Sequence, residues 1–383
     1  MTLPLTGITV VALEQAVAVP FATRQLADLG ATVIKVERPG RGDFARDYDE
    51  TVDGLSSHFV WLNRNKKSIV LDLKTGSGQE TLRRLISKAD VFVQNLAPGA
   101  LERLGFVPEE LCEEFPQLIT CSLSGYGRGG PLGDKKAYDL LIQAEAGFLS
   151  VTGTEDEPAK AGISIADIAA GMYTYSGILS ALYEREVTGK GRQLSVALLD
   201  SLAEWMGFPY YYARYGGSRP VRAGAHHASI APYGPVSCLD GSLLIAVQNE
   251  REWERFCTSV LANPELATDS RFDSVSNRIA NRVDLDRLID ERLGTRPVQE
   301  VAEALDRAGI AQGKMNDVAD LDQHPQLLAR NRIGTVETEA GTVNAFLPVV
   351  ESAGWTPRLE PVPAVGADTE AILGWLEEER VSA

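Results

Sequence analysis

Ile8-Thr9-Val10-Val11-Ala12-Leu13 is a short apolar run that predicts a β-strand, and it opens the pattern that decides the fold. Residues 21–29 follow with helical spacing that ends at Gly30, and residues 31–36 are largely β-branched and predict a second strand. This alternation of strand and helix predicts a parallel sheet covered by helices, hence an α/β fold. The same signals continue at residues 68–73, 89–93 and 118–123 for strands and 79–88 for a helix.

The chain has 383 residues, which is too long for one simple core and favours a large domain with a smaller one. We expect residues 1–200 to form most of a Rossmann-like large domain, and the aromatic and glycine-rich residues 201–225 to form a linker. Residues 226–325 predict a small α+β domain, with a strand at 243–247 and helices at 251–261, 282–293 and 298–308. Residues 326–383 are expected to return to the large domain through strands within 334–350 and a helix at 368–376, capped by Asp368 or Thr369.

Charge and cysteine content limit the partners of this chain. Its 53 acidic residues outnumber 37 basic ones, and the net charge of −16 disfavours nucleic acid and anionic membranes. Small molecules or copies of the same chain are the expected partners. The four cysteines are far apart and suggest neither a metal site nor a disulfide framework. With no signal peptide and no apolar span of about 20 residues, the sequence predicts a soluble, cytoplasmic protein.

A nicotinamide dinucleotide site is the obvious alternative for an alternating first half. Glu37, at the end of the second strand, would then be the acid that binds the ribose. The turn after the first strand argues against this, since residues 14–20 lack the three glycines that let a pyrophosphate approach a helix N-terminus.

Two acidic residues in mostly apolar surroundings point to an enzyme. Asp139 ends the stretch Lys136-Ala137-Tyr138-Asp139, and Asp167 ends the stretch of residues 162–167 at the head of a helix-like run. A carboxylate in a dry, preorganised pocket can attack an activated acyl group or move a proton, whereas a solvated one does neither well.

Six motifs run nearly from end to end of the chain: Pro4-Leu5-x-Gly7-Ile8, residues 30–37, Asn63-Arg64-Asn65-Lys66-Lys67-Ser68-Ile69, Asn95-x-x-Pro98-Gly99, residues 189–193 and Gly366-x-Asp368-Thr369. In their order and spacing, the chain closely resembles the class III CoA transferases, a family that includes formyl-CoA transferase and, as a side branch, α-methylacyl-CoA racemase. The resemblance implies the fold of that family, in which two ring-like subunits interlock as a homodimer and CoA binds to the Rossmann-like domain. It also implies a coenzyme A thioester as substrate, with no permanently bound cofactor and no metal.

In this family the nucleophile is an aspartate that begins a helix, and the matching position is Asp167. Ser164 and Ala166 are small enough to let a thioester approach, and the dipole of a helix over residues 168–183 would help to keep the carboxylate ionised. The alternative is that Asp167 only caps this helix, a common role for aspartate.

The expected reaction follows from carboxylate chemistry. Asp167 would attack the donor acyl-CoA to give a mixed anhydride, and the CoA thiolate would return to give an aspartyl-CoA thioester. The acceptor carboxylate would then reverse the sequence. Either intermediate would hydrolyse, so water must be excluded, and the glycine-rich residues 125–130 and 224–229 are candidate lids.

CoA brings phosphates and an adenine, and the resemblance assigns positions to both. The cations Arg38, Arg103 and Lys136 match family positions that contact CoA, although each could otherwise be an ordinary solvated side chain. Val17 replaces the glutamine of formyl-CoA transferase near the acyl group. The other matching positions are Asn95 and Leu96 beside the nucleotide, Leu71 lining it, and Gln15 as the polar residue nearest to Val17.

Tyr138 distinguishes the two branches of the family. The racemases have a His-Asp pair here, and the histidine exchanges the proton α to the thioester. Tyr138 replaces that histidine, and a neutral phenol is a poor base, so the transferase branch is favoured. Asp139 is expected to orient the acceptor or a lid, or to make a structural hydrogen bond. A CoA-binding protein without catalysis is the third alternative, which the presence of Asp167 disfavours.

The acceptor is predicted from residues 224–234. This segment lacks the four-glycine loop of formyl-CoA transferase, which disfavours oxalate and formate. It resembles family members that act on C5 dicarboxylates such as itaconate or mesaconate, commonly with succinyl-CoA as donor. His226 and His227 could bind the distal carboxylate of such an acid, or they could be solvent-facing loop residues.

Overall fold

The computed structural model describes residues 3–217 and 219–378. The chain divides into two compact units, each with its own core. The first contains Met1–Phe148, Ala161–Tyr210 and Pro325–Ala383, and the second contains Leu149–Lys160 and Tyr211–His324.

A six-stranded sheet in which neighbouring strands pair in parallel is the centre of the first unit, so the predicted α/β fold with a parallel sheet is confirmed. The strand order is β3-β2-β1-β4-β5-β6, and the direction of winding reverses between β1 and β4. The expected strands are all present, although the third begins and ends a few residues earlier than predicted. Their bounds are β1 Thr9–Leu13, β2 Thr32–Glu37, β3 Lys66–Val70, β4 Val91–Gln94, β5 Ile119–Ser124 and β6 Gln193–Ala197.

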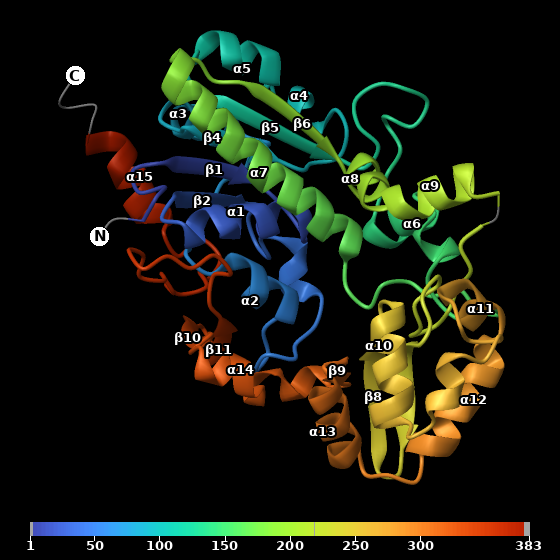
Figure 1. Ribbon diagram of the computed structural model, residues 1–383. Helices are drawn as coiled ribbons and strands as arrows, with labels where there is room; N and C mark the ends of the chain where they lie inside the picture. Colours follow the sequence, from blue (N-terminus) through green and yellow to red (C-terminus); the bar gives the residue numbers. More distant parts are fainter. Residues whose placement is uncertain (1–2, 218, 379–383) are drawn as a thin grey trace. The chain divides into compact units, whose positions relative to one another are not determined.

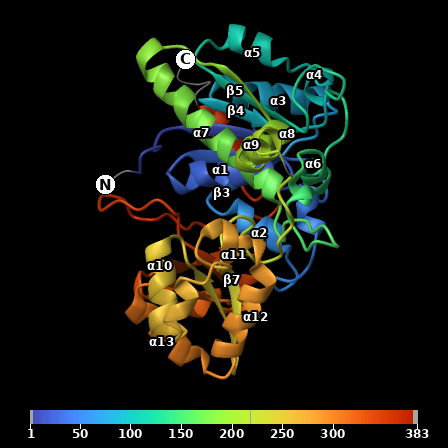
Figure 2. The ribbon, with the colours of Figure 1, turned by 45° about the vertical axis from the view of Figure 1, so that its right-hand side comes forward.

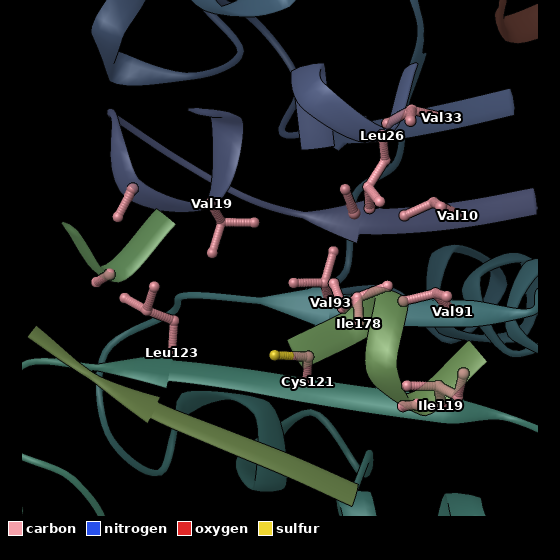
Figure 3. Close-up of a cluster of buried hydrophobic side chains, with 14 of the residues drawn as sticks. Val10, Val19, Leu26, Val33, Val91, Val93, Ile119, Cys121, Leu123 and Ile178 are labelled. Atoms are coloured by element: carbon pink, nitrogen blue, oxygen red, sulfur yellow. The ribbon is translucent and has the colours of Figure 1, made fainter. Parts of the chain in front are cut away.

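Helices cover both faces of this sheet (Figure 1). On one face, Val10 and Val93 pack with residues of α1 (Ala18–Asp28) and α7 (Ile165–Thr188), and Figure 3 shows Ile178 of α7 among the strand side chains. On the other face, Val11 and Phe92 pack with α3 (Gly76–Ser87) and α15 (Thr369–Glu378). Burial on both faces explains why the strands are continuous apolar runs. The remaining helices of this unit are α2 Ser57–Asn63, α4 Ala100–Arg103, α5 Pro108–Glu114, α6 Asp139–Glu145, α8 Leu198–Trp205 and α14 Pro325–Ala329, with a 3-10 turn at Phe44–Asp47. Helix α9 (Gly207–Tyr215) and the 3-10 turn Phe148–Ser150 each contain residues of both units.

Helices α1 and α7 pack closely because α7 has a glycine at their crossing. A Cβ atom on Gly171 would lie 2.7 Å from the carbonyl oxygen of Ala18 and 3.0 Å from the ring of Phe21. Just before this crossing, Ile168 packs against Val17 and Phe21. The head of α7, which carries Asp167, is therefore fixed beside the loop between β1 and α1.

The C-terminal segment belongs to the first unit. A hairpin of β10 (Ile333–Thr338) and β11 (Gly341–Phe346) precedes α15, in agreement with the predicted strands. Asp368 directly precedes the helix, but its carboxylate accepts a hydrogen bond from the backbone N–H of Ser68 at 2.9 Å. Thr369 likewise accepts from the N–H of Val70 through its hydroxyl at 3.2 Å. Both side chains thus tie the tail to β3.

The second unit combines a small antiparallel sheet with helices (Figure 2). Helices α12 and α13 pack on the sheet and have the predicted bounds, whereas the predicted helix at 251–261 consists of α10 followed by a π-helical turn, Phe256–Val260. Residues 201–225, expected as a linker, include most of α8 and all of α9. The elements are β7 Tyr233–Cys238, β8 Gly241–Ala246, β9 Ala311–Lys314, α10 Glu250–Arg255, α11 Val275–Ala280, α12 Arg282–Leu293 and α13 Val298–Ala308, with 3-10 turns at Pro264–Ala267 and Val318–Gln323.

Within residues 3–217 and 219–378, every helix is too short or too polar to cross a lipid bilayer. The four cysteines, all in the described part of the chain, are free thiols.

Candidate active site

A cleft of about 710 Å³, part of it open to solvent, lies at the carboxyl ends of the first four strands. Strands β1 and β4 contribute to it from either side of the point where the winding reverses, which is where open parallel sheets bind ligands. The lining residues come from the ends of β1 (Leu13, Glu14, Gln15), β2 (Val36, Glu37, Arg38, Pro39, Gly42, Asp43), β3 (Leu71, Asp72, Leu73, Lys74) and β4 (Leu96, Leu104).

Four of the residues predicted from the sequence meet in this cleft: Gln15, Arg38, Leu71 and Leu96. Asn95 supports the cleft through the backbone. Its side-chain amide donates to the carbonyl oxygen of Gln15 at 2.9 Å, and its side-chain oxygen accepts from the N–H of Gln15 at 2.9 Å. Because both hydrogen bonds hold the loop after β1, the Asn95 side chain braces the switch point between β1 and β4.

Arg103 and Lys136 are exposed and lie outside the lining of this cleft. The Arg103 guanidinium lies close to Gly99, since a Cβ atom added to that glycine would be 2.8 Å from its Nη1. Sequence reasoning missed Lys74, the cation that lines the cleft just beyond β3. Its position after the third strand is a usable signal, because the carboxyl ends of parallel strands meet at one edge of a sheet.

A network of buried charges lies at the wall of the cleft. Glu14 accepts hydrogen bonds from Lys66 at 2.7 Å and Thr23 at 2.6 Å, and Lys35 lies 3.4 Å from Glu14 and 2.8 Å from Asp43. The side chains of Glu14, Lys35 and Lys66 are fully buried. Burial opposes the charge on Glu14, but Lys66 and Lys35 outweigh it and hold its pKa below the ordinary value. The lysine-rich motif at residues 63–69 therefore supplies internal ion pairs.

Glu37 is committed to internal hydrogen bonds. It accepts from Arg46 at 2.7 and 2.9 Å, from the Ser68 hydroxyl at 2.6 Å and from the N–H of Asp43 at 2.8 Å. Burial opposes its charge, but these donors and the nearby Lys35 keep its pKa below the ordinary value. A carboxylate that is already occupied in this way is a poor ribose ligand, in agreement with the sequence argument against a dinucleotide site.

Asp167 lies in the first turn of α7, and the cap of this helix is a different residue. The carboxylate of Asp139 accepts from the N–H groups of Ala166 at 2.8 Å and Asp167 at 3.3 Å. Its second oxygen accepts from the side chain of Gln143 at 2.6 Å. The N-cap residue itself is Ser164, so the alternative in which Asp167 only caps the helix is wrong. For Asp139, the structure has the structural hydrogen bond that the sequence left open.

The environment of Asp167 makes its carboxyl group unusually basic. Burial raises its pKa to about 7, with a further contribution from the negative charge of Asp139. The sequence predicted that the helix dipole would keep this group ionised. Burial and the second carboxylate act in the opposite direction to the dipole, and the net shift of the pKa is upward.

Two tyrosines belong to the surroundings of Asp167. Burial raises the pKa of Tyr48 to about 12, and the charges of Asp43 and Asp167 and the phenol of Tyr138 add to this effect. Tyr48 therefore keeps its proton and remains a hydrogen-bond donor near the carboxylate. Tyr138 is 65% exposed and directly precedes α6. Sequence reasoning missed Tyr48, which lies in an irregular segment with no motif of its own.

His226 and His227 belong to the second unit. The ring of His227 stacks on Tyr233, with centroids 5.1 Å apart, and its Nδ1 accepts from the N–H of Ser229 at 3.2 Å. His226 packs against Gly234, where a Cβ atom would lie 2.3 Å from its Nδ1. Both histidines thus have local structural contacts, and their role in binding substrate stays a prediction.

The first unit therefore contains a cleft and a basic carboxyl group in the first turn of α7. No group of three or more His, Cys, Asp or Glu side chains in the described residues is arranged to hold a metal ion. A carboxylate in this setting can act as a nucleophile toward an activated acyl group or as a base.

Comparison with known proteins shows what the chain as a whole is similar to. A family model described as CoA-transferase family III matches residues 5–369. An acetyl-CoA:oxalate CoA-transferase of Acetobacter aceti is 37% identical over 332 residues, which are 86% of this chain and 85% of that protein. A succinate–glutarate CoA-transferase of Agrobacterium fabrum is 34% identical over 384 residues, 98% and 96% of the two chains. The crystal structure of a CAIB/BAIF family protein from Brucella suis superposes with a TM-score of 0.87 at 35% identity, covering 98% of this chain and 100% of that one.

Proposed function

The chain belongs to CoA-transferase family III, and we propose that it moves CoA from a donor acyl-CoA, succinyl-CoA in the first instance, to a C5 dicarboxylic acid, with Asp167 as the nucleophile. The observation that carries this proposal is the basic carboxyl group of Asp167 at the rigid head of α7, held there by Asp139. Poor solvation makes a carboxylate a better nucleophile, and a pKa of about 7 leaves much of the group ionised near neutral pH.

The reaction conserves the energy of the thioester through two kinds of covalent intermediate. An oxygen of Asp167 attacks the thioester carbonyl of the donor, and the CoA thiolate leaves, which gives a mixed anhydride. The thiolate then attacks the aspartyl carbonyl, releases the donor acid and forms an aspartyl-CoA thioester. The acceptor carboxylate attacks this thioester to form a second anhydride, and the thiolate attacks the acceptor carbonyl and restores Asp167.

CoA is assigned to the cleft of the first unit, which we infer to be a Rossmann-like CoA-binding domain. Leu71 and Leu96 would contact the adenine, and Arg38 and Lys74 would contact phosphate groups. Gln15 would lie toward the acyl end, next to the loop that Ile168 fixes. Contacts from the exposed Arg103 and Lys136 stay predictions.

The choice of acceptor rests on similarity and on the sequence around His226 and His227. A relative named for succinate and glutarate, which is a C5 dicarboxylate, spans almost the whole chain and supports a dicarboxylate. The relative named as an acetyl-CoA:oxalate CoA-transferase makes oxalate the competing acceptor. The absence of the four-glycine loop of formyl-CoA transferase from this sequence argues against oxalate. Itaconate and mesaconate, the acids predicted from the sequence, belong in the same comparison.

The test uses succinyl-CoA with glutarate, itaconate, mesaconate or oxalate as acceptor, and follows the acyl-CoA pool by mass spectrometry. Each acceptor carries ¹⁸O in its carboxylate groups. By the proposed path, one ¹⁸O atom passes from the acceptor to the carboxyl group of Asp167 in each turnover, and the peptide that contains Asp167 gains the corresponding mass. The matched variant is Asp167→Asn, which preserves the shape of the side chain.

Formation of a new acyl-CoA with label on Asp167 supports the proposal and names the acceptor. Formation of a new acyl-CoA without label on that peptide contradicts the assigned nucleophile. A parallel reaction with a 2-methylacyl-CoA in deuterated water tests the racemase alternative, and deuterium at the α-carbon without acyl exchange would establish it. Binding of CoA without either reaction would establish the non-catalytic alternative.

We also infer that the protein acts as a cytoplasmic homodimer, and the interlocked arrangement is the form that the family resemblance implies. Exposed apolar side chains on α7 and α9, including Tyr183, Val187, Phe208 and Tyr210, support an additional protein contact. Sedimentation equilibrium tests this inference, which a purely monomeric mass would contradict.

A further inference from the structure

We propose that His58, held by Asp49, binds the distal carboxylate of the acceptor and so selects dicarboxylic over monocarboxylic acids. This inference rests on the proposed function and assigns a residue to its choice of substrate. No sequence motif pointed to His58, which is the second residue of α2.

Asp49 is a carboxylate that stays ionised and is held in place. It accepts hydrogen bonds from the hydroxyl and N–H groups of Thr51, at 2.6 and 3.0 Å, and from those of Ser57, at 2.8 and 3.0 Å. These donors lower the pKa of Asp49 well below its ordinary value, and the Thr51 hydroxyl contributes most. A fixed negative charge thus lies at the start of α2.

His58 turns one nitrogen toward this charge and leaves the other accessible. Its Nδ1 is buried, makes no hydrogen bond and lies 3.6 Å from a carboxylate oxygen of Asp49. The His58 side chain as a whole is 41% exposed, and its Nε2 is not among the buried unpaired atoms of the described residues. Because Nδ1 faces Asp49, the Nε2–H side of the ring is left for a second anion.

Tyr48 connects His58 to the nucleophile. The rings of Tyr48 and His58 meet edge to face, with centroids 5.4 Å apart and an interplanar angle of 89°. The charge of Asp167 acts in turn on the phenol of Tyr48. His58 also lies one turn before Leu62 on α2, and Leu62 shares a buried cluster with Ile168, the residue after Asp167. This position suits the far end of an acid whose near carboxylate reacts at Asp167.

The charges around Asp167 show why such a residue is needed. Asp139 and Asp43 add negative charge, which repels a dianionic acceptor. Lys35 and Arg46 are already committed, since Lys35 is paired with Asp43 and Arg46 with Glu37. The His58 ring, with 41% of its side chain exposed, offers an N–H donor to an anion at this position.

The test measures kcat and KM for two matched series of acceptors with succinyl-CoA as donor. Dicarboxylates from oxalate to adipate are compared with monocarboxylates of the same chain length. The test variants are His58→Gln and Asp49→Asn. His227→Gln tests a histidine that the sequence predicted to bind the acceptor, and His324→Gln is the control at a histidine with neither proposed role. We expect His58→Gln to raise KM about tenfold for the preferred dicarboxylate, with kcat changed less than about threefold and monocarboxylates unaffected.

Asp49→Asn should change KM in the same direction by about threefold, because the fixed charge behind the imidazole is lost. Three results would overturn the assignment. His58→Gln could raise KM equally for dicarboxylates and monocarboxylates, it could change kcat alone, or selectivity for dicarboxylates could be lost only in His227→Gln. So would a wild-type preference for monocarboxylates. Absence of transfer to every acid would instead refute the proposed function, whereas transfer with unchanged selectivity refutes only the role of His58. Circular dichroism of each variant separates these results from loss of folding.

Discussion

Asp167 and Glu14 are both largely buried carboxylates of the first unit, yet their surroundings shift their pKa values in opposite directions. Glu14 is paired with Lys66 and Lys35, and its pKa is lowered. Asp167 has a second carboxylate, Asp139, as its charged neighbour, and its pKa is raised to about 7. Burial opposes ionisation at both positions, so the neighbours decide the outcome.

The difference separates a structural carboxylate from a reactive one. Glu14 stabilises the wall of the cleft because its charge is compensated, and compensation also makes it a poor nucleophile. The uncompensated charge of Asp167 costs stability and gives reactivity, a common association at catalytic sites. Each prediction below changes one of these two regions and measures whether the other responds.

The largest effect is expected from Asp167→Asn. Removal of the nucleophile should reduce kcat for CoA transfer by about a thousandfold or more, since no described neighbour can replace it. Glu14→Gln, if it folds, should retain most of its kcat per folded molecule. Steady-state transfer assays on both variants check this, and a Glu14 variant as inactive as the Asp167 variant would remove the distinction between the regions.

The next effect concerns stability. Glu14→Gln should lower the free energy of unfolding by about 3–5 kcal/mol, because Lys66 and Lys35 would keep buried charges without their partner. Urea denaturation followed by circular dichroism measures the change. Glu102→Gln, which breaks a solvent-exposed pair with Arg128, is the control and should have little effect. Similar losses in both variants would show that burial of the pair is unimportant.

The third prediction is a pH dependence that Asp167 alone imposes. Its folded pKa, about 7, lies above the value of about 4 in an unfolded chain, so the folded state retains a proton that the unfolded state has lost. Stability from this group should therefore fall as the pH rises from about 4 to 7 and then level off. Asp167→Asn should match the wild type near pH 4 and exceed its unfolding free energy by about 1–3 kcal/mol at pH 8. Denaturation of both proteins between pH 4 and 8 measures the difference between their unfolding free energies. A difference that stays the same at every pH would contradict the prediction.

Asp139→Asn should have a smaller effect on both properties. Loss of the charged cap should cost about 0.5–2 kcal/mol of stability and loosen the head of α7, with a reduction in kcat of about tenfold. The same change removes the charge that helps to raise the pKa of Asp167, so the acidic limb of the kcat profile should move to lower pH. Glu145→Gln, at the end of α6, is the comparison, and an unchanged pH profile in Asp139→Asn would argue against the coupling.

The smallest expected effect is at the cleft. Lys74→Ala and Arg38→Ala should each raise the KM for the acyl-CoA by about threefold to tenfold with little change in kcat, because each removes one contact to a phosphate. Competition with desulfo-CoA tests binding without chemistry. Arg271→Ala, in the second unit, is the control, and an equal effect there would show that overall charge, not the cleft, is responsible.

The sequence alone predicted the parallel sheet and most of the helices, because hydrophobic periodicity is local. Residues 282–293 and 298–308 show this, since both predicted helices have the observed bounds. Family resemblance indicated Gln15, Arg38, Leu71 and Leu96, which follow the first four strands and meet in one cleft because the strands are parallel. Asp167 was found through its place at the head of a helix and through family resemblance.

Tertiary structure decided the electrostatics. The cap on α7 comes from Asp139, 27 residues from Ala166, and Glu14 finds its partner in Lys66, 52 residues away. The charge of Asp167 acts on Tyr48, and His58 faces Asp49, without any motif that joins them. Secondary structure follows from neighbours in sequence, whereas a pKa depends on burial and on charges that only folding brings together, so the identity of the carboxylates was readable and their reactivity was not.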